Sequence, residues 1–239
     1  MSALLRTAFD LLDGLDRADT AAEIGRRYFE RLKPFGFGAI FARAHALDPD
    51  DAREHIFYRE TPKGWEQIYA DRNFAQTNFV THAARRTARP FIWSEIALAS
   101  DSSFTRANEE MWHTLHAFGL RDGLAVPNHT PGSVGVLSLA TFADADLPPD
   151  RRKAIILSSH YIHERLRELS QPPFPRVNLT RRERDCLAFA AEGKSDWDIA
   201  QILGIAQSTV HAHVENAKRK LGVKTRMQAV AKLARAGEL

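Results

Sequence analysis

The chain has 239 residues, enough for two domains, and its formal net charge is +3 at pH 7. This charge is unevenly spread: from Pro173 onward there are 12 Lys and Arg against 7 Asp and Glu, a net charge of +5, which leaves −2 for the rest. The single cysteine, Cys186, excludes an intramolecular disulfide, and the N-terminal residues show neither signal-peptide character nor a long apolar run. We therefore expect a cytoplasmic protein without membrane spans, with Cys186 in a core and a basic C-terminal part suited to a phosphate-bearing partner.

Helical and strand patterns alternate before Pro173. In chain order, the sequence predicts helices over Ser2–Leu12 and Thr20–Leu32, strands over Ala39–Ala46 and Glu54–Glu60, helices over Trp65–Asn73, Asn78–Thr87 and Phe104–Phe118, strands over Gly123–Pro127 and Val134–Phe142, and a closing helix over Pro149–Ser170. A loop, Asn128–Ser133, joins the last two strands. Helices on a mostly antiparallel sheet make an α+β fold, here an α/β/α sandwich that is large enough to enclose a small-molecule cavity.

A proline-rich linker is predicted at residues 171–176. Proline lacks a backbone N–H and restricts the residue before it, so Pro172, Pro173 and Pro175 end the preceding helix. We therefore expect two domains, residues 1–170 and residues 177–239.

The segment Leu179–Ala234 predicts a helix-turn-helix. Gly204 separates two short amphipathic runs, and Ser195 and Ser208 stand where helix N-caps are expected, because a serine oxygen can accept a first-turn N–H. A short helix, a glycine turn and a second helix form the unit that places its second helix in the major groove of DNA.

The second helix of this unit is expected over Ser208–Leu221. Its core-facing stripe comprises Val210, Val214, Ala217 and Leu221. Small or polar residues near its start suit base edges, and Lys218, Arg219 and Lys220 near its end suit phosphates. The alternative is a solvated basic face without a partner; the agreement of turn, caps and basic cluster favours DNA.

The same segment closely resembles the DNA-binding domain of LuxR-type regulators, which NarL-type response regulators share. The matching positions are Leu179-Thr180, Arg182-Glu183, Leu187, Gly193-Lys194-Ser195, Ile199-Ala200, Leu203, Thr209-Val210, His213, Asn216 and Lys220-Leu221. The resemblance implies an all-α four-helix domain that binds a two-fold site on double-stranded DNA as a homodimer. It also implies base-reading positions at His211, Ala212 and Glu215, and phosphate contacts from Lys194, Thr209, Lys218, Arg219 and Lys224. Ser208, opposite the core stripe, and Asn216, on its flank, complete the candidate DNA-binding set.

The front part resembles LuxR-type sensor domains, which bind acyl-homoserine lactones. Trp65 and Tyr69 stand at the four-residue spacing of that family. Trp93 is the last residue of Arg89–Trp93, and Gly123 is the last residue of the glycine-containing turn Gly119–Gly123, both as in the family pattern. Ser138, between two leucines, matches a hydroxyl position of the family. The resemblance implies a binding pocket formed by Trp65, Tyr69, Trp93 and Ser138, with Gly123 as the last glycine of the family pattern. Since buried polar groups need partners, we expect Trp93 to donate to the lactone carbonyl and Tyr69 to the amide carbonyl. Ser138 would bind the amide region directly or bridge to the ligand through a water. Trp65 would lay its ring along the ligand. The same aromatic residues are also compatible with a plain core.

One position departs from the family: Asn78 stands where the family has Asp. An Asp carboxylate accepts the ligand's amide N–H in a charge-assisted bond, roughly twice as strong as a neutral one. Asn78 can still accept through its amide oxygen, but its NH₂ group needs a partner of its own. The outcomes are weaker lactone binding, a different ligand whose acceptor meets Asn78, or loss of ligand control; we favour a ligand-responsive receptor with an unusual ligand.

The leading hypothesis is therefore a signal-responsive transcription regulator that binds a palindromic promoter site and needs no cofactor. A phosphorylation receiver is disfavoured, because the strand Ala39–Ala46 is followed by acidic residues only in a loop, Asp48–Asp51. An enzyme is disfavoured because no paired acid and base stand out. The histidine pairs His113/His116 and His160/His163 lack further metal ligands in their surroundings. A front domain that senses a non-lactone ligand, or none, stays open.

Overall fold

The structure, a computed structural model, describes residues 2–46, 54–97, 105–130, 132–143, 147–170, 178–236 and 238–239. Nearly all of these residues fall into two compact units, a front unit that ends with Ser170 and a second unit that begins with Asn178. The predicted linker, residues 171–176, lies outside the described residues.

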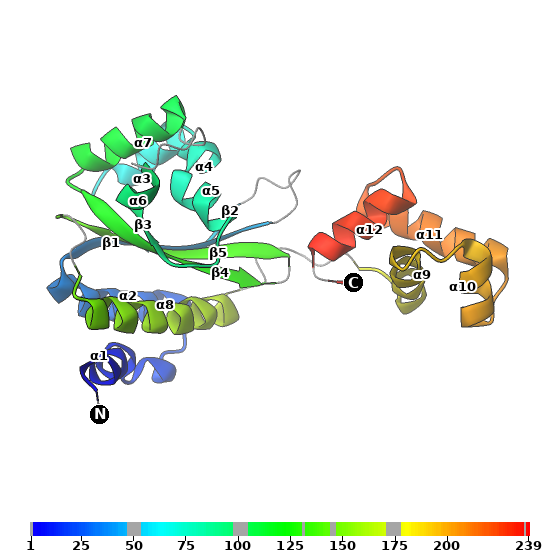
Figure 1. Ribbon diagram of the computed structural model, residues 1–239, viewed down its shortest axis with the longest axis horizontal. Coiled ribbons are helices and arrows are strands. Elements are labelled where there is room, and N and C mark those ends of the chain that lie inside the picture. The colour runs from blue at the N-terminus through cyan, green and yellow to red at the C-terminus, as the bar shows by residue number, and fades with distance from the viewer. Residues whose placement is uncertain are drawn as a thin grey trace. The chain divides into compact units, whose positions relative to one another are not determined.

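The front unit is built on one sheet. In the part of the chain that the structure describes, five strands form it in the order β2-β1-β5-β4-β3, with β2 antiparallel to β1 and β3 antiparallel to β4. Their bounds are β1 Phe37–Ala46, β2 Glu54–Glu60, β3 Phe91–Ile92, β4 Asp122–Thr130 and β5 Ser133–Thr141. All nine residues of β5 are buried, because helices cover both faces of the sheet (Figure 1).

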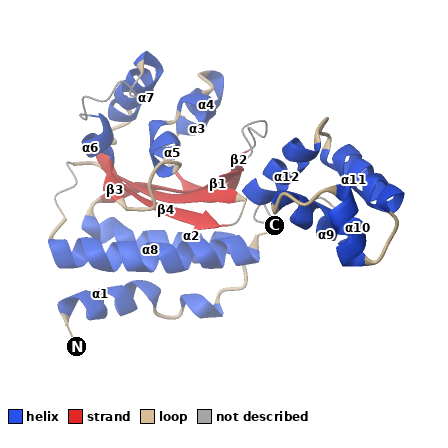
Figure 2. Ribbon diagram, turned by 45° about the vertical axis from the view of Figure 1, so that its right-hand side comes forward, coloured by secondary structure: helices blue, strands red, loops and turns tan. Residues whose placement is uncertain are grey.

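Two groups of helices enclose the sheet (Figures 1 and 2). One face carries α3 Trp65–Asp71, α4 Phe74–Thr77, α5 Phe79–Ala84, α6 Trp93–Ala97 and α7 Arg106–Ala117. The other carries α2 Ala21–Leu32 and α8 Pro149–Leu169, with α1 Ala3–Leu12 outside them. The buried hydroxyl of Tyr28 on α2 lies 2.9 Å from the hydroxyls of both Ser158 and Ser159 on α8, which joins these two helices. The predicted α+β sandwich is confirmed.

Two predicted elements differ from the structure. The predicted helix Asn78–Thr87 is shorter, and Asn78 itself is extended, because its side chain caps α5 by accepting the Thr81 N–H. The predicted loop Asn128–Ser133 is mostly strand, since β4 continues to Thr130 and β5 begins at Ser133. The two strands therefore extend further than the Pro and Gly of this segment suggested.

The second unit consists, within residues 178–236, of four helices: α9 Arg181–Ala191, α10 Asp196–Leu203, α11 Gln207–Leu221 and α12 Arg226–Arg235. Their apolar faces form one core, in which Cys186 is fully buried as expected. Capping boxes at Thr180/Glu183, Ser195/Asp198 and Thr225/Gln228 begin three of the helices. The predicted four-helix domain and the cap at Ser195 are confirmed.

The predicted cap at Ser208 is wrong. The turn after α10 is left-handed at Gly204, and Ile205 packs against the core. This leaves Ala206 as the extended residue before the helix, so α11 begins one residue earlier than predicted, at Gln207. Ser208 lies exposed in the first helical turn, and no side chain caps the helix.

Candidate functional site

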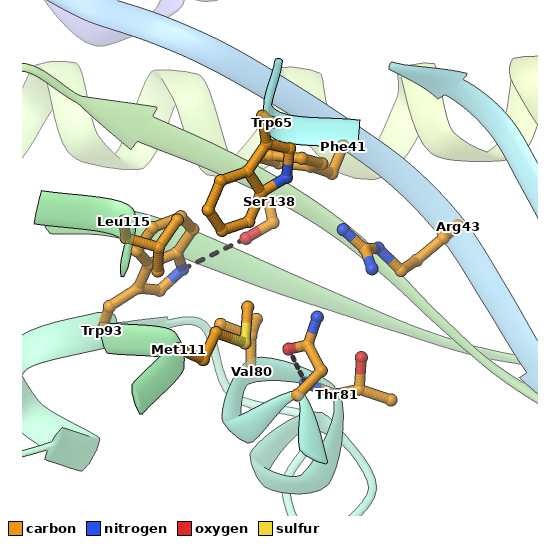
Figure 3. Close-up of a pocket in the computed structure, with 10 residues that line it drawn as sticks. Phe41, Arg43, Trp65, Val80, Thr81, Trp93, Met111, Leu115 and Ser138 are labelled. Carbon is orange, nitrogen blue, oxygen red and sulfur yellow. Dashed lines mark hydrogen bonds between the residues drawn. The ribbon is translucent and has the colours of Figure 1, made fainter. Parts of the chain in front are cut away.

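A small cavity lies between the sheet and the helices α3, α5, α6 and α7 (Figure 3). Ten residues line it: Phe41, Arg43, Trp65, Asn78, Val80, Thr81, Trp93, Met111, Leu115 and Ser138. Its volume is about 10 Å³, about what a single water needs. A larger ligand therefore requires these side chains to move apart.

The indole of Trp93 forms one end of the cavity. Its Nε1–H donates to Oγ of Ser138 at 3.1 Å, and both side chains are buried (Figure 3). The start of α6 is held by Asp122, whose carboxylate accepts the backbone N–H and the hydroxyl of Ser94 at 3.0 and 2.7 Å. Gly123 lies behind the indole rather than in the cavity lining, and a Cβ there would come within 2.5 Å of the Trp93 ring. Gly123 thus positions Trp93 by leaving room for it.

Asn78 is the centre of a polar network at the other end. Its Oδ1 accepts from the Thr81 N–H and its Nδ2 donates to the Tyr69 hydroxyl, both at 3.1 Å. Arg43 Nη1 donates to the same Tyr69 oxygen at 2.9 Å and to Glu54 Oε1 at 2.7 Å. The Asn78 NH₂ group thus has the partner that it needs. Since the Tyr69 oxygen accepts two hydrogen bonds, its own hydrogen is available to donate.

Tyr69 lies beside a second small cavity. That cavity, of about 20 Å³, is lined by Phe41, Arg43, Glu54, Ile56, Arg59, Trp65, Glu66 and Tyr69. Phe41, Arg43 and Trp65 line both cavities, so these three side chains form the wall between them. The Trp65 ring packs against two aromatic rings. Its centroid lies 6.4 Å from that of Phe41 and 6.0 Å from that of Tyr69.

The structure thus brings Trp65, Asn78, Trp93 and Ser138 to one cavity and joins Tyr69 to it through the Asn78 amide. Sequence reasoning missed the other lining residues, above all Arg43. A signal was present in the sequence. Arg43 stands in the mostly apolar run Phe37–Ala46, and arginine is rarely buried in a strand unless it is paired.

A buried histidine borders the network. His45 Nε2 lies 3.3 Å from Thr81 Oγ1 and 3.6 Å from Glu54 Oε1. Burial lowers the pKa of His45 to about 4, although the Glu54 carboxylate acts to raise it. His45 is therefore neutral at pH 7, and the charges nearest Asn78 and Tyr69 are those of Arg43 and Glu54.

Neither a metal site nor a membrane-spanning helix is found within the described ranges. No group of three or more His, Cys, Asp or Glu side chains there could hold a metal ion. None of the helices described is both long and apolar enough to cross a bilayer.

The second unit presents one face of α11 to solvent. Val210, Val214, Ala217 and Leu221 are buried, which confirms the predicted core stripe. Of the candidate DNA-binding residues, Lys194, Ser208, Thr209, His211, Ala212, Glu215, Arg219 and Lys224 are exposed, and Asn216 and Lys218 are half-buried. Lys218 pairs with Glu215 at 2.6 Å, and Arg219 donates to Asn216 at 2.7 Å, so both cations lie along the helix surface.

Lys220 differs from its neighbours. Its Nζ binds Glu183 Oε2 at 2.7 Å, and Glu183 is a buried residue of the Thr180 capping box. Burial acts to raise the pKa of Glu183, but the bonds from Lys220 and Thr180 outweigh it and hold the pKa below its ordinary value. Lys220 therefore has a structural role, because its ammonium compensates a buried carboxylate. That it also contacts a phosphate stays a prediction.

Comparison with known proteins matches both units. The family described as "Autoinducer binding domain" matches residues 20–166, and "Bacterial regulatory proteins, luxR family" matches residues 177–233. The chain is 35% identical to the "HTH-type quorum sensing-dependent transcriptional regulator RpaR" of Rhodopseudomonas palustris, over 95% of this chain and 92% of that one. It is 30% identical to the "Transcriptional activator protein BjaR1" of Bradyrhizobium diazoefficiens, over 95% and 93%.

A solved structure supports the fold. The crystal structure of Escherichia coli SdiA matches with a TM-score of 0.74 at 22% identity and covers 98% of each chain. The two family matches and the 35% identical relative show that the chain belongs to the LuxR family of bacterial regulatory proteins. It is a transcription regulator, not an enzyme, with an autoinducer-binding domain before a luxR-type helix-turn-helix domain.

Proposed function

We propose that the protein binds an acyl-homoserine lactone in the front unit and, as a homodimer in the cytoplasm, binds a palindromic promoter site through α11. The observation that carries the proposal is the arrangement of Trp93 and Asn78 around one buried cavity, with Tyr69 hydrogen-bonded to the Asn78 amide at its edge. A membership in the autoinducer-binding family and a relative named as quorum sensing-dependent support it.

The lactone ring fits the Trp93 end. An indole N–H is a donor only, so it suits the ring carbonyl, which is an acceptor. Ser138 Oγ now accepts that N–H at 3.1 Å, and the serine hydroxyl is free to rotate toward the ligand's amide region once the carbonyl takes its place. Both groups are buried, so a ligand that separated them without offering a polar atom of its own would leave them unpaired, at about 1–3 kcal/mol each.

The ligand's amide fits Tyr69 and Asn78. The Tyr69 hydroxyl hydrogen, which no described residue accepts, can donate to the amide carbonyl. Asn78 Oδ1 accepts one backbone N–H and has a second lone pair for the amide N–H of the ligand. Asn in place of Asp therefore keeps one acceptor for the ligand, but the bond is neutral and weaker than a charge-assisted one.

Binding enlarges the space. An acyl-homoserine lactone is larger than the cavity at Trp93 and Asn78. The side chains of Trp65 and Phe41 separate this cavity from the second cavity. Displacing this wall joins the two cavities. The free energy of binding then stabilises the opened arrangement, and a ligand that prefers it shifts the population toward it.

Thermal melting tests the ligand. Purified protein is melted with and without N-acyl-homoserine lactones of increasing chain length, and binding raises the Tm, with about 2.7 kcal/mol of stabilisation at a hundredfold excess over Kd. Trp93→Phe removes the indole N–H and should lose most of the shift. Trp112→Phe is the matched control, because Trp112 lies outside the cavity lining. An absence of any shift with every lactone contradicts the lactone proposal.

Asn78 supports a second candidate. A receptor for another small molecule, with an acceptor that meets the Asn78 NH₂, would show no lactone shift until Asn78→Asp restores one. That pattern would move the proposal from lactones to a different ligand while leaving the sensor role in place.

The DNA interface rests on α11. Exposed Thr209, His211 and Ala212 lie at the start of the helix, whose first-turn N–H groups no side chain caps, and an uncapped helix start suits a phosphate. The double variant Lys218→Glu/Arg219→Glu should lower the affinity for promoter DNA. The slope of log K against log salt concentration should become shallower by about 0.9 for each phosphate contact that is lost. Arg181→Glu with Arg182→Glu on α9, where both side chains are exposed, changes the net charge by the same amount and is the control. Sedimentation of the protein with DNA tests the dimer.

A further inference from the structure

Arg43 is a cation inside the front unit. It lies on β1, only 6% of it is exposed, and its guanidinium carbon lies 5.1 Å from the Phe41 ring centroid and 5.6 Å from that of Tyr69. Burying such a charge is costly unless it is paired. Glu54 compensates the charge at 2.7 Å, but a methionine or leucine would fill the same space at lower cost. The presence of arginine at this position therefore indicates a hydrogen-bonding role that an apolar side chain could not fill.

Most of the hydrogen-bonding capacity of Arg43 is unused. An arginine has five N–H donors, and both hydrogen bonds that it makes, to Glu54 and Tyr69, come from Nη1. Among the residues that the structure describes, Nε and Nη2 have no partner. Figure 3 shows the guanidinium directed into the space bounded by Trp65 and Ser138.

The place of Arg43 fits one part of the ligand. Its Nη1 lies 2.9 Å from the Tyr69 hydroxyl, to which the amide carbonyl of the ligand is assigned above. Arg43 also lines both cavities, so the acyl chain must pass it on the way from the first to the second. The third carbon of an acyl chain lies two bonds from the amide carbonyl carbon, which brings it next to the guanidinium.

We propose that Arg43 determines specificity by donating to an oxygen that the ligand's acyl chain carries at its third carbon. This inference rests on the proposed lactone function and deepens it. A plain methylene at that carbon would press against N–H donors and leave them unpaired, whereas an oxo oxygen accepts them. Hydrogen bonds to charged groups stabilise by more than neutral ones, so the oxygen improves affinity about tenfold or more.

Matched ligand pairs test the inference. Titration calorimetry on the purified full chain compares N-hexanoyl- with N-(3-oxohexanoyl)-homoserine lactone, and the octanoyl pair likewise. The 3-oxo member of each pair is expected to bind at least tenfold more tightly. In Arg43→Met combined with Glu54→Gln, which removes cation and carboxylate together, the two Kd values of a pair converge.

Two control variants isolate Arg43. Glu54→Gln alone keeps the guanidinium and should keep the preference. Arg59→Met removes the other arginine that lines the second cavity, one that pairs with Glu66 at 2.6 Å, and should keep the preference as well. The comparison in the unmodified protein needs no variant, so a misfolded double variant does not remove the test.

Each failure has its own signature. Equal Kd values for the two members of each pair overturn the role of Arg43 and leave the lactone proposal standing. A 3-oxo preference that survives Arg43→Met/Glu54→Gln overturns the role of Arg43 as well. Absence of binding by all four lactones overturns the lactone proposal and this inference together.

Discussion

Gly123 on β4 lies directly against the indole of Trp93: a Cβ on Gly123 would come within 2.5 Å of the ring and 2.7 Å of the Leu139 carbonyl oxygen. Neither neighbour can yield easily, because one is a buried ring and the other is backbone. The hydrogen of glycine is thus what lets Trp93 reach Ser138.

Gly123→Ala is expected to destabilise the front unit by about 1–3 kcal/mol, the usual cost of overpacking a core. Thermal melting measures this, and lactone binding should weaken with it because Trp93 is displaced. Gly38→Ala is the matched control. A Cβ there also meets a ring, at 2.2 Å, but that ring belongs to the exposed Phe142 and can swing away. Equal losses in the two variants would contradict the role given to Gly123.

Asn78→Asp adds a negative charge to the cavity and leaves the shape of the side chain nearly unchanged. Both side chains cap α5 through the Thr81 N–H, so the helix start is retained. The carboxylate would bind a ligand N–H in a charge-assisted bond. We expect a Kd for acyl-homoserine lactones about tenfold lower, by calorimetry. Asn78→Ala removes both functions and should cost about 1 kcal/mol of stability through the lost cap. Weaker lactone binding by Asn78→Asp would show that the pocket is built around the amide.

Much of the second unit could be predicted from sequence. The stripe Val210, Val214, Ala217 and Leu221 was readable because helical periodicity is local and one face of α11 is open to solvent. The cap at Ser208 failed because a helix begins where the preceding turn allows, and Ile205 fixes that turn by packing into the core. The polarity of the residues around Ser208 does not reveal this tertiary contact, so it could not predict where α11 begins.

The front unit was harder to predict in detail. Spacing located Trp65, Asn78 and Trp93, but the network around Asn78 joins β1, β2, α3 and α5, and such pairings between distant segments leave no periodic mark. Arg43 was overlooked for a related reason. Helices cover both faces of β1, so nearly every residue is buried and no alternation distinguishes a cavity-lining side chain from its neighbours.

His163 should make stability depend on pH. It is 1% exposed on α8, its Nε2 lies 3.2 Å from the Arg43 carbonyl oxygen, and its Nδ1 has no partner among the described residues. Burial lowers the pKa of His163 to about 4, while the contact to the Arg43 carbonyl and the Glu164 charge act to raise it, and Arg167 and His160 to lower it. Since the folded pKa lies below the unfolded value, the stability contribution is complete above about pH 6.5 and is lost as the pH falls toward 4.

Urea denaturation at pH 7 and pH 5 measures this loss. His163 should account for a decrease of about 2 kcal/mol between the two. His45, whose pKa is also lowered to about 4, adds to the total. His163→Gln keeps an N–H donor for the Arg43 carbonyl but does not titrate, so its stability should fall less over the same range. An unchanged pH dependence in His163→Gln would contradict the assignment.

Lys218 and Lys220, two residues apart on α11, should separate folding from DNA binding. Lys220 compensates the buried Glu183 at 2.7 Å, whereas Lys218 pairs with the exposed Glu215. Lys220→Gln leaves Glu183 without its cation and should lower the stability of the second unit by about 1 kcal/mol or more. Lys218→Gln breaks an exposed surface pair, which adds little stability, and should instead weaken DNA binding and its salt dependence. Melting curves and DNA titrations at two salt concentrations, run on both variants, test this; a larger stability loss in Lys218→Gln than in Lys220→Gln would reverse the two assignments.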